Sequence, residues 1–189
     1  DPEPKNYLAS VSLSDGTITP LVEGADFYSS PALSPDGKRI AWLSWNHPNM
    51  PWHGTELWVS DFDGDRLANP VRVHGGPTQT VFQPQWLPSG DLLFSAEPEG
   101  WWNLQIWDGD TVRSVYKAER EFGLPQWAFG MSTTAVCTHG IAALYCTEGL
   151  WGLMVIDHQT GTVRELNLPF SSITQLRSDG SKLSFLASS

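Results

Sequence analysis

Residues 31–45 read PALSPDGKRIAWLSW, in which a Pro-Asp-Gly turn separates a short apolar segment from a longer one. Turn residues of this kind between two β-prone segments are typical of a hairpin. The longer run, Arg39–Trp45, is bounded by that turn on one side and by a polar loop from Asn46 on the other. The stretch therefore predicts two antiparallel strands, because no helical periodicity competes with this interpretation.

Hairpins of the same kind return along the chain at intervals of 47 to 49 residues. One series of apolar runs, each followed by a polar turn, begins at Leu8, Leu57, Leu104 and Leu153. A second series interleaves with the first and begins at Pro31, Pro84, Pro125 and Thr174. Three members of the second series reach a Gly-containing turn at a matching distance, and the Pro125 member does not. Two hairpins in a unit of this length are typical of a β-propeller blade.

The repeat predicts an all-β propeller segment of about four blades in a single domain, 1–189. We expect an outer hairpin over 6–23, full blades over 30–76, 83–116 and 125–168, and an inner hairpin over 173–188. In the third full blade, the inner strand is expected over Trp127–Met131 and onward to Cys137. Two alternatives stay open at this point. Either the end hairpins pair with each other and close a four-bladed ring, or the chain is an arc of a larger ring. In the second case the unpaired strand edges of the arc favour self-association.

The composition suits a packed β protein and limits the partners. Of the 189 residues, 40% are hydrophobic and ten are Trp, so large rings are available to fill the space between stacked sheets. The net charge of −10 argues against nucleic acid and anionic membrane surfaces, which require Lys and Arg. The same charge favours cationic groups. The sequence has no apolar run of membrane length and no motif for a cofactor.

The two cysteines, Cys137 and Cys146, flank an expected hairpin that turns at residues 138–141. That register places Cys137 near Ala142, several pairs away from Cys146, so a disulfide is not expected. Two free thiols fit a reducing compartment, and we expect a cytoplasmic location on this ground.

Longer loops should gather at one face of the propeller, because the tight turns of the hairpins all lie on the other. Long loops that carry aromatic and charged residues on a rigid scaffold are common binding sites. Glu119 and Glu121 flank Arg120 and suit a cationic group such as a peptide amino terminus, or else form a solvated loop with a local Arg pairing. Trp101 and Trp102 either line a ligand channel or split, with one ring packed between blades and the other partly exposed. The candidate substrate-binding residues are Glu119, Glu121, Trp101, Trp102, His47, Asn49 and Trp52.

No catalytic or metal site is predicted. His47 and His53 lack further ligands at zinc spacing. The stretch Asp61–Asp65 begins like a calcium loop but lacks the later Gly and Glu, so it is interpreted as a turn. The stretch Gly130–Thr134 lacks the last Gly of a nucleophile elbow and has no helix after it.

Several loop strings resemble the propeller domain of bacterial serine peptidases of the prolyl oligopeptidase family (S9), in the acylaminoacyl-peptidase and aminopeptidase-like branch. These strings are GADFYSSP (24–31), HPNMPW (47–52), FQPQW (82–86), GWWNL (100–104) and PQWAFGMS (125–132). With the segments around them they span residues 20–185. The tetrapeptide SPDG is shared with unrelated propellers, whereas the longer strings are specific.

The resemblance implies a two-part enzyme, in which a propeller sits over an α/β-hydrolase domain that carries Ser, Asp and His. The propeller of such an enzyme filters substrates and lends residues to peptide binding, a role in which Glu119 and Glu121 look similar to propeller carboxylates of dipeptidyl-peptidase relatives. The 189 residues contain no such hydrolase domain, so we expect no catalysis from them, and the larger family ring favours the open arc. The expected function is gating and docking of peptides for the hydrolase domain. The alternative is a stand-alone, TolB-like propeller that binds proteins.

Overall fold

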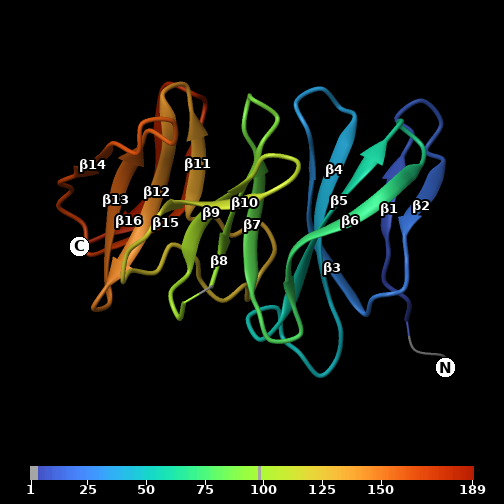
Figure 1. Cartoon of the computed structure of the whole chain (residues 1–189), viewed down its shortest axis with the longest axis horizontal. Helices are drawn as coiled ribbons and strands as arrows, with labels where there is room; N and C mark the ends of the chain where they lie inside the picture. Colours follow the sequence, from blue (N-terminus) through green and yellow to red (C-terminus); the bar gives the residue numbers. More distant parts are fainter. Residues whose placement is uncertain (1–3, 98) are drawn as a thin grey trace.

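The computed structural model describes residues 4–97 and 99–189, which form sixteen antiparallel strands in five sheets (Figure 1). Sheet 1 contains β1 (Leu8–Val11) and β2 (Ile18–Val22). Sheet 2 contains β3 (Phe27–Leu33), β4 (Arg39–Trp45), β5 (Thr55–Phe62) and β6 (Leu67–Gly76). Sheet 3 contains β7 (Val81–Trp86), β8 (Leu92–Ala96), β9 (Asn103–Trp107) and β10 (Val112–Tyr116). Sheet 4 contains β11 (Thr134–Cys137), β12 (Gly140–Thr147), β13 (Leu150–Ile156) and β14 (Val163–Leu166). Sheet 5 contains β15 (Ser172–Ser178) and β16 (Leu183–Ser188).

The sheets form a row in which sheet 1 lies at one end, followed by sheets 2 and 3, while sheets 4 and 5 overlap in this view at the other end (Figure 1). A shared core cluster places sheet 5 against sheet 4. Each four-stranded sheet is a meander in which consecutive strands are hydrogen-bonded neighbours, which is the strand order of a propeller blade. Within the described residues, β1 pairs with β2 and β15 pairs with β16, so the end hairpins do not pair with each other. The all-β propeller and its open arc are therefore confirmed, and closure at four blades is wrong. No helix that could cross a membrane occurs in these residues.

The inner strands share a local irregularity. In β3, β7 and β15 the register shifts at one point, and there Ser30, Gln83 and Gln175 have φ of 53°, 51° and 58°. A bulge residue in the left-handed region bends its strand and increases the local twist. The same bend at the same place in three sheets indicates that it helps to set how successive inner strands diverge.

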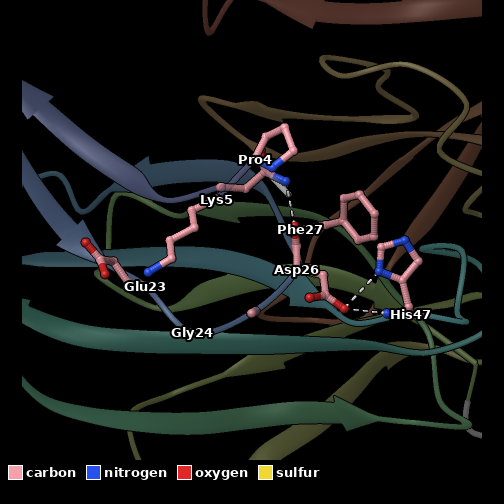
Figure 2. A pocket seen from close by; sticks show the side chains of 9 residues that line it. Pro4, Lys5, Glu23, Gly24, Asp26, Phe27 and His47 are labelled. Carbon is pink, nitrogen blue, oxygen red and sulfur yellow. Dashed lines mark hydrogen bonds and ion pairs between the residues drawn. The ribbon is translucent and has the colours of Figure 1, made fainter. Parts of the chain in front are cut away.

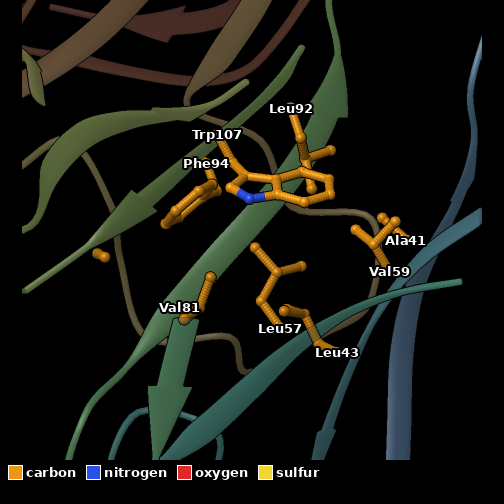
Figure 3. Close-up of a cluster of buried hydrophobic side chains, with 9 residues drawn as sticks. Ala41, Leu43, Leu57, Val59, Val81, Leu92, Phe94 and Trp107 are labelled. Carbon is orange, nitrogen blue, oxygen red and sulfur yellow. The ribbon is translucent and has the colours of Figure 1, made fainter. Parts of the chain in front are cut away.

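The core lies between the sheets. The cluster between sheets 2 and 3 is drawn in Figure 3 and joins Ala41, Leu43, Leu57 and Val59 to Val81, Leu92, Phe94, Ala96 and Trp107. A second cluster fills the space between sheets 3 and 4, and a third lies between sheets 4 and 5. Each fully buried Leu or Phe stabilises the fold by roughly 1.5–3 kcal/mol. Because each cluster takes residues from two sheets, packing between neighbours holds the row together.

Polar side chains also join neighbouring sheets. Arg39 of β4 lies over the ring of Trp86 in β7, with the guanidinium carbon 4.7 Å from the ring centroid, and donates to the Gly90 carbonyl at 2.8 Å. Gln83 accepts from the backbone N–H groups of Thr133 and Thr134, at 2.7 and 3.0 Å, and donates to the Thr134 carbonyl at 2.8 Å. The buried Gln83 side chain therefore positions the start of β11.

Two expectations about sheet 4 are corrected. Residues 127–131 form no strand, and the inner strand begins only at Thr134, where Gln83 binds the backbone. The following hairpin turns at residues 138–139, so Cys137 lies opposite Gly140 instead of Ala142. Cys146 lies opposite Trp151, and both thiols are free.

Candidate binding face

The loops divide between two faces of the row of sheets. Short turns join the first strand of a sheet to the second and the third to the fourth. In them, Asp side chains accept hydrogen bonds from nearby backbone N–H groups: Asp108 accepts from Asp110 and Thr111 at 2.9 and 2.8 Å. The Thr111 N–H, followed by that of Asp110, holds the pKa of the Asp108 carboxyl below its usual value. The opposite face, here called the loop face, carries the other connections, including 46–54, 77–80, 99–102 and 117–133.

His47 is held by Asp26 at one end of the loop face (Figure 2). The Asp26 carboxylate accepts from the His47 backbone N–H at 2.8 Å and lies 3.0 Å from the ring Nδ1. The backbone hydrogen bond, followed by the ring contact, lowers the pKa of Asp26. The side of the imidazole is covered by Phe27, at 4.8 Å between ring centroids. His47 thus lines a hollow of about 710 Å³ in a fixed orientation, and Lys5 and Glu23 lie on the other side of it (Figure 2).

Asn49 belongs to the same loop as His47, and its side chain forms a hydrogen bond within the protein. Its Nδ2 donates to the Pro77 carbonyl at 2.9 Å and so joins loop 46–54 to the β6–β7 connection. Gly54 lies at the same junction, where a Cβ would be 2.3 Å from the Pro77 oxygen. This close packing fixes the loop that carries His47 and Trp52.

Trp101 and Trp102 point to different surroundings. Trp102 stacks on Phe82 at 5.9 Å with an angle of 19° between the rings. Its backbone N–H donates to Glu121 at 3.0 Å and its indole N–H donates to Glu97 at 3.2 Å. Trp101 is 37% exposed. The two rings therefore lie in different surroundings, because Trp102 packs on Phe82 of its own sheet and Trp101 is partly open to solvent.

Glu119 and Glu121 likewise differ in their surroundings. Glu121 positions Trp102, as described above. Glu119 is exposed and lines a hollow of about 300 Å³ together with Trp101, Asn103 and the Lys117–Glu99 ion pair. The structure therefore brings Trp101 and Glu119 together and places Glu121, His47, Asn49 and Trp52 outside that hollow.

Arg120, between these two glutamates, pairs with a distant strand. Its Nη1 lies 2.6 Å from Glu165 Oε1 in β14, and its guanidinium carbon lies 4.5 Å from the centroid of the Tyr145 ring. The hydrogen bond from Arg120 lowers the pKa of Glu165, while burial, followed by the hydrogen bond to Glu165, raises the pKa of Tyr145. Arg120 therefore joins the loop to sheet 4 and leaves Glu119 without this neutralising partner.

Trp52 contacts a residue that the site prediction left out. Its ring lies 4.2 Å from that of Trp127, between centroids, and Trp127 belongs to the connection between β10 and β11. Trp127 and Phe129 are 74% and 73% exposed. The aromatic residues at positions 127 and 129 were the signal in the sequence, but the strand expected over residues 127–131 placed them outside the loops. Among the described residues, no three or more His, Cys, Asp or Glu gather as a metal site.

This arrangement defines a class of protein: a β-propeller segment with its long, aromatic and charged loops on one face. No family model matches the chain, and no curated protein matches it at a significant level. Solved structures do match. A puromycin-hydrolysing peptidase from Mycobacterium tuberculosis is 37% identical with a TM-score of 0.85, over 92% of this chain and 27% of that one.

A puromycin hydrolase is 32% identical with a TM-score of 0.84, over 90% of this chain and 26% of the other. TolB from Acinetobacter baumannii has a TM-score of 0.60 at 15% identity, over 96% of this chain and 46% of that one, a likeness that shows the fold alone. A prolyl endopeptidase and an acylaminoacyl peptidase also share the fold. The chain is thus similar to the propeller segments of S9 peptidases, and the resemblance drawn from the sequence is confirmed. It spans about a quarter of the length of the puromycin-hydrolysing chains.

Proposed function

We propose that this segment docks peptide substrates and limits their access to an α/β-hydrolase domain of the S9 type. The observation that carries the proposal is the similarity to two puromycin-hydrolysing enzymes over nine-tenths of the chain, at 32% and 37% identity. The hydrolase domain would supply the serine nucleophile, and the propeller segment would supply the docking surface. The TolB likeness does not favour the alternative of a stand-alone protein-binding module, because it rests on the fold alone.

In this proposal the hollow beside Trp101 receives the amino terminus of a peptide. Two exposed carboxylates line it, and Glu119 is the one that does not pair with Lys117, while Trp101 offers an exposed ring in the same hollow. A carboxylate attracts an ammonium group, and the aromatic face adds to that attraction. The overall charge of −10 draws the same cationic group toward the chain. Lys117, which lines the same hollow, pairs with Glu99 instead.

The test is binding of labelled tripeptides to the purified chain, measured by fluorescence anisotropy. Replacement of Glu119 by Gln is expected to weaken binding of a free-amino peptide by about tenfold, since a hydrogen bond to a charged group contributes roughly 1.5–3 kcal/mol. Binding of the acetylated peptide should change little. Glu148→Gln, at an exposed turn of the same face, is the matched control. An equal loss for free and acetylated peptides would rule out the amino-terminal role.

Two further properties belong to this proposal. The free thiols Cys137 and Cys146 fit a reducing cytoplasm, which cell fractionation with thiol labelling would check. Self-association through strand edges is supported by β1 and β16, each of which has one partner strand within the described residues.

A further inference from the structure

Asn103 is a buried polar residue in the hollow of about 300 Å³ described above, here called the Glu119 hollow. It is the first residue of β9 and only 5% exposed, yet it lines this hollow together with Trp101, Ala118 and Glu119. Burial of an amide costs free energy unless its hydrogen-bonding groups find partners. The partners of Asn103 therefore indicate what this position contributes.

The amide of Asn103 binds the backbone on both sides of the Glu119 hollow. Its Oδ1 accepts from the Ala118 N–H at 2.8 Å. Its Nδ2 donates to the carbonyls of Ala118 and Trp101, each at 3.1 Å. An N–H group only donates and a carbonyl only accepts, so these partners fix which end of the amide is the oxygen. The side chain thus joins the segment before β9 to the segment after β10.

These hydrogen bonds continue the β9–β10 ladder beyond the point where its backbone pairing ends. Tyr116, the last residue of β10, lies opposite Leu104, and Asn103 is the next residue along β9. An Asn side chain carries the same C=O and N–H groups as a peptide unit, so it can hold Ala118 as a neighbouring strand would. A backbone that has left the strand is therefore still fixed at Ala118.

Glu119 lies between two fixed neighbours. On one side Asn103 holds Ala118, as described. On the other side the backbone N–H of Glu121 donates to the Cys146 carbonyl at 3.1 Å, and the Cys146 N–H donates back to the Glu121 carbonyl at 2.9 Å. Glu119 itself is exposed. Binding groups on a fixed backbone lose less conformational entropy when a ligand binds, and they depend on the residues that hold them.

We propose that Asn103 is a positioning residue for the docking of peptide amino termini and acts through Glu119 and Trp101. This inference rests on the proposed function and assigns Asn103 an indirect role, which is to hold the two residues that contact the ammonium group. Without its amide, the backbone groups of Ala118 and Trp101 lose their partners and must turn toward water. The Glu119 carboxylate and the Trp101 ring are then no longer held around one position.

The experiment measures anisotropy of the labelled tripeptides, free and acetylated, with the Asn103→Leu chain. This substitution keeps a similar side-chain volume and removes all polar atoms. Binding of the free-amino peptide should weaken by about three- to tenfold, while binding of the acetylated peptide changes little. In a Glu119→Gln chain, Asn103→Leu should cause no further loss, because the carboxylate through which it acts is already replaced. Asn103→Ser, which is smaller and keeps a hydroxyl, replaces the leucine variant if that variant does not fold.

Gln83→Leu is the matched control. Gln83 is also a buried amide that binds backbone, through Thr133 and Thr134, but it does not line the Glu119 hollow. Its replacement should lower the free energy of unfolding and leave the ratio of the two peptide affinities unchanged. A second measurement needs no peptide. By hydrogen exchange, the Ala118 amide should exchange at least about tenfold faster in Asn103→Leu, with little change in β12.

The outcomes separate this inference from the proposed function. If Glu119→Gln weakens binding of the free-amino peptide and Asn103→Leu does not, Asn103 has no positioning role and docking at Glu119 stands. If Asn103→Leu causes the same loss with and without the Glu119 carboxylate, or if the Ala118 amide keeps its exchange rate, the inference is likewise wrong. If Glu119→Gln leaves binding of the free-amino peptide unchanged, the proposed amino-terminal role is wrong and the inference is overturned with it.

Discussion

At the scale of single residues, Trp102 joins several residues of the loop face through its ring and its two N–H groups. Its ring stacks on Phe82, its indole N–H binds Glu97, and its backbone N–H binds Glu121. Buried aromatic residues with a polar group usually find such a partner, because an unmade hydrogen bond costs more than a made one contributes. The consequence is that both glutamates are oriented by one tryptophan.

Replacement of Gly123 by Ala tests this packing. The new Cβ would lie 1.8 Å from a ring carbon of Trp102, so the Trp102 ring or the backbone around residue 123 must move. Overpacking of this kind costs about 1–3 kcal/mol, to be measured by urea unfolding. Gly76→Ala is the matched control, because its Cβ would be 4.0 Å from the nearest atom. Equal unfolding free energies for the two variants would show that Trp102 is not held as described.

The candidate residues show what a sequence can and cannot indicate at this scale. Loop composition correctly selected the segments that carry exposed aromatic and charged groups, such as Trp101 and Glu119. It could not indicate that Arg120 reaches Glu165, 45 residues away, or that Asp26 holds His47, because such partners depend on how sheets stack. The contact between Trp52 and Trp127 is of the same long-range kind.

At the scale of elements, the strand pattern of the sequence predicted the strands well except in residues 123–131, the connection between β10 and β11. Pro125-Gln126-Trp127 repeats the local pattern of Pro84-Gln85-Trp86, which is part of β7, yet it lies in no strand. The inner strand of sheet 4 starts where Gln83 binds the backbone of Thr133 and Thr134. Tertiary hydrogen bonds therefore overrode a local pattern, as is common for β-prone segments. The sequence did contain one sign of this difference, because the Pro125 member of the series lacks the Gly-containing turn that follows the inner strand in the other members.

The two end hairpins differ in how they are packed, and this leads to a prediction. Ile173 and Leu176 of β15 are buried in the cluster between sheets 4 and 5, whereas no residue of β1 or β2 belongs to a core cluster. Regions with few buried apolar contacts open locally at low free energy. By hydrogen exchange and mass spectrometry, amides of β1–β2 should exchange at least about a hundredfold faster than those of β15–β16. Equal protection would mean that sheet 1 is docked more firmly than its burial indicates.

At the scale of the whole molecule, the repeat predicted the strand order and the number of sheets, since each blade is encoded by its own hairpins. It left open whether the end hairpins meet. That outcome depends on the angle between successive sheets, which side chains between sheets and bulges such as those at Ser30 and Gln83 determine together. That angle is not determined by the sequence of any single hairpin, so it cannot be predicted from local sequence patterns.

The open arc leads to the final prediction, which concerns assembly. β1 occupies the third and β16 the second strand position of a blade, so β16 of one copy can pair with β1 of another and complete a four-stranded sheet. Exposed Val11 and Leu186 lie on these two strands. We expect light scattering to show a mass that rises with concentration above the 20.9 kDa of one chain. The double substitution Val11→Lys and Leu186→Lys should keep the chain at that mass, because charged edges oppose strand pairing. Leu150→Lys, at the exposed first residue of β13 and on neither of these two strands, should leave association intact. A constant monomer mass for the unsubstituted chain, or loss of association in the Leu150 variant, would contradict pairing through these edges.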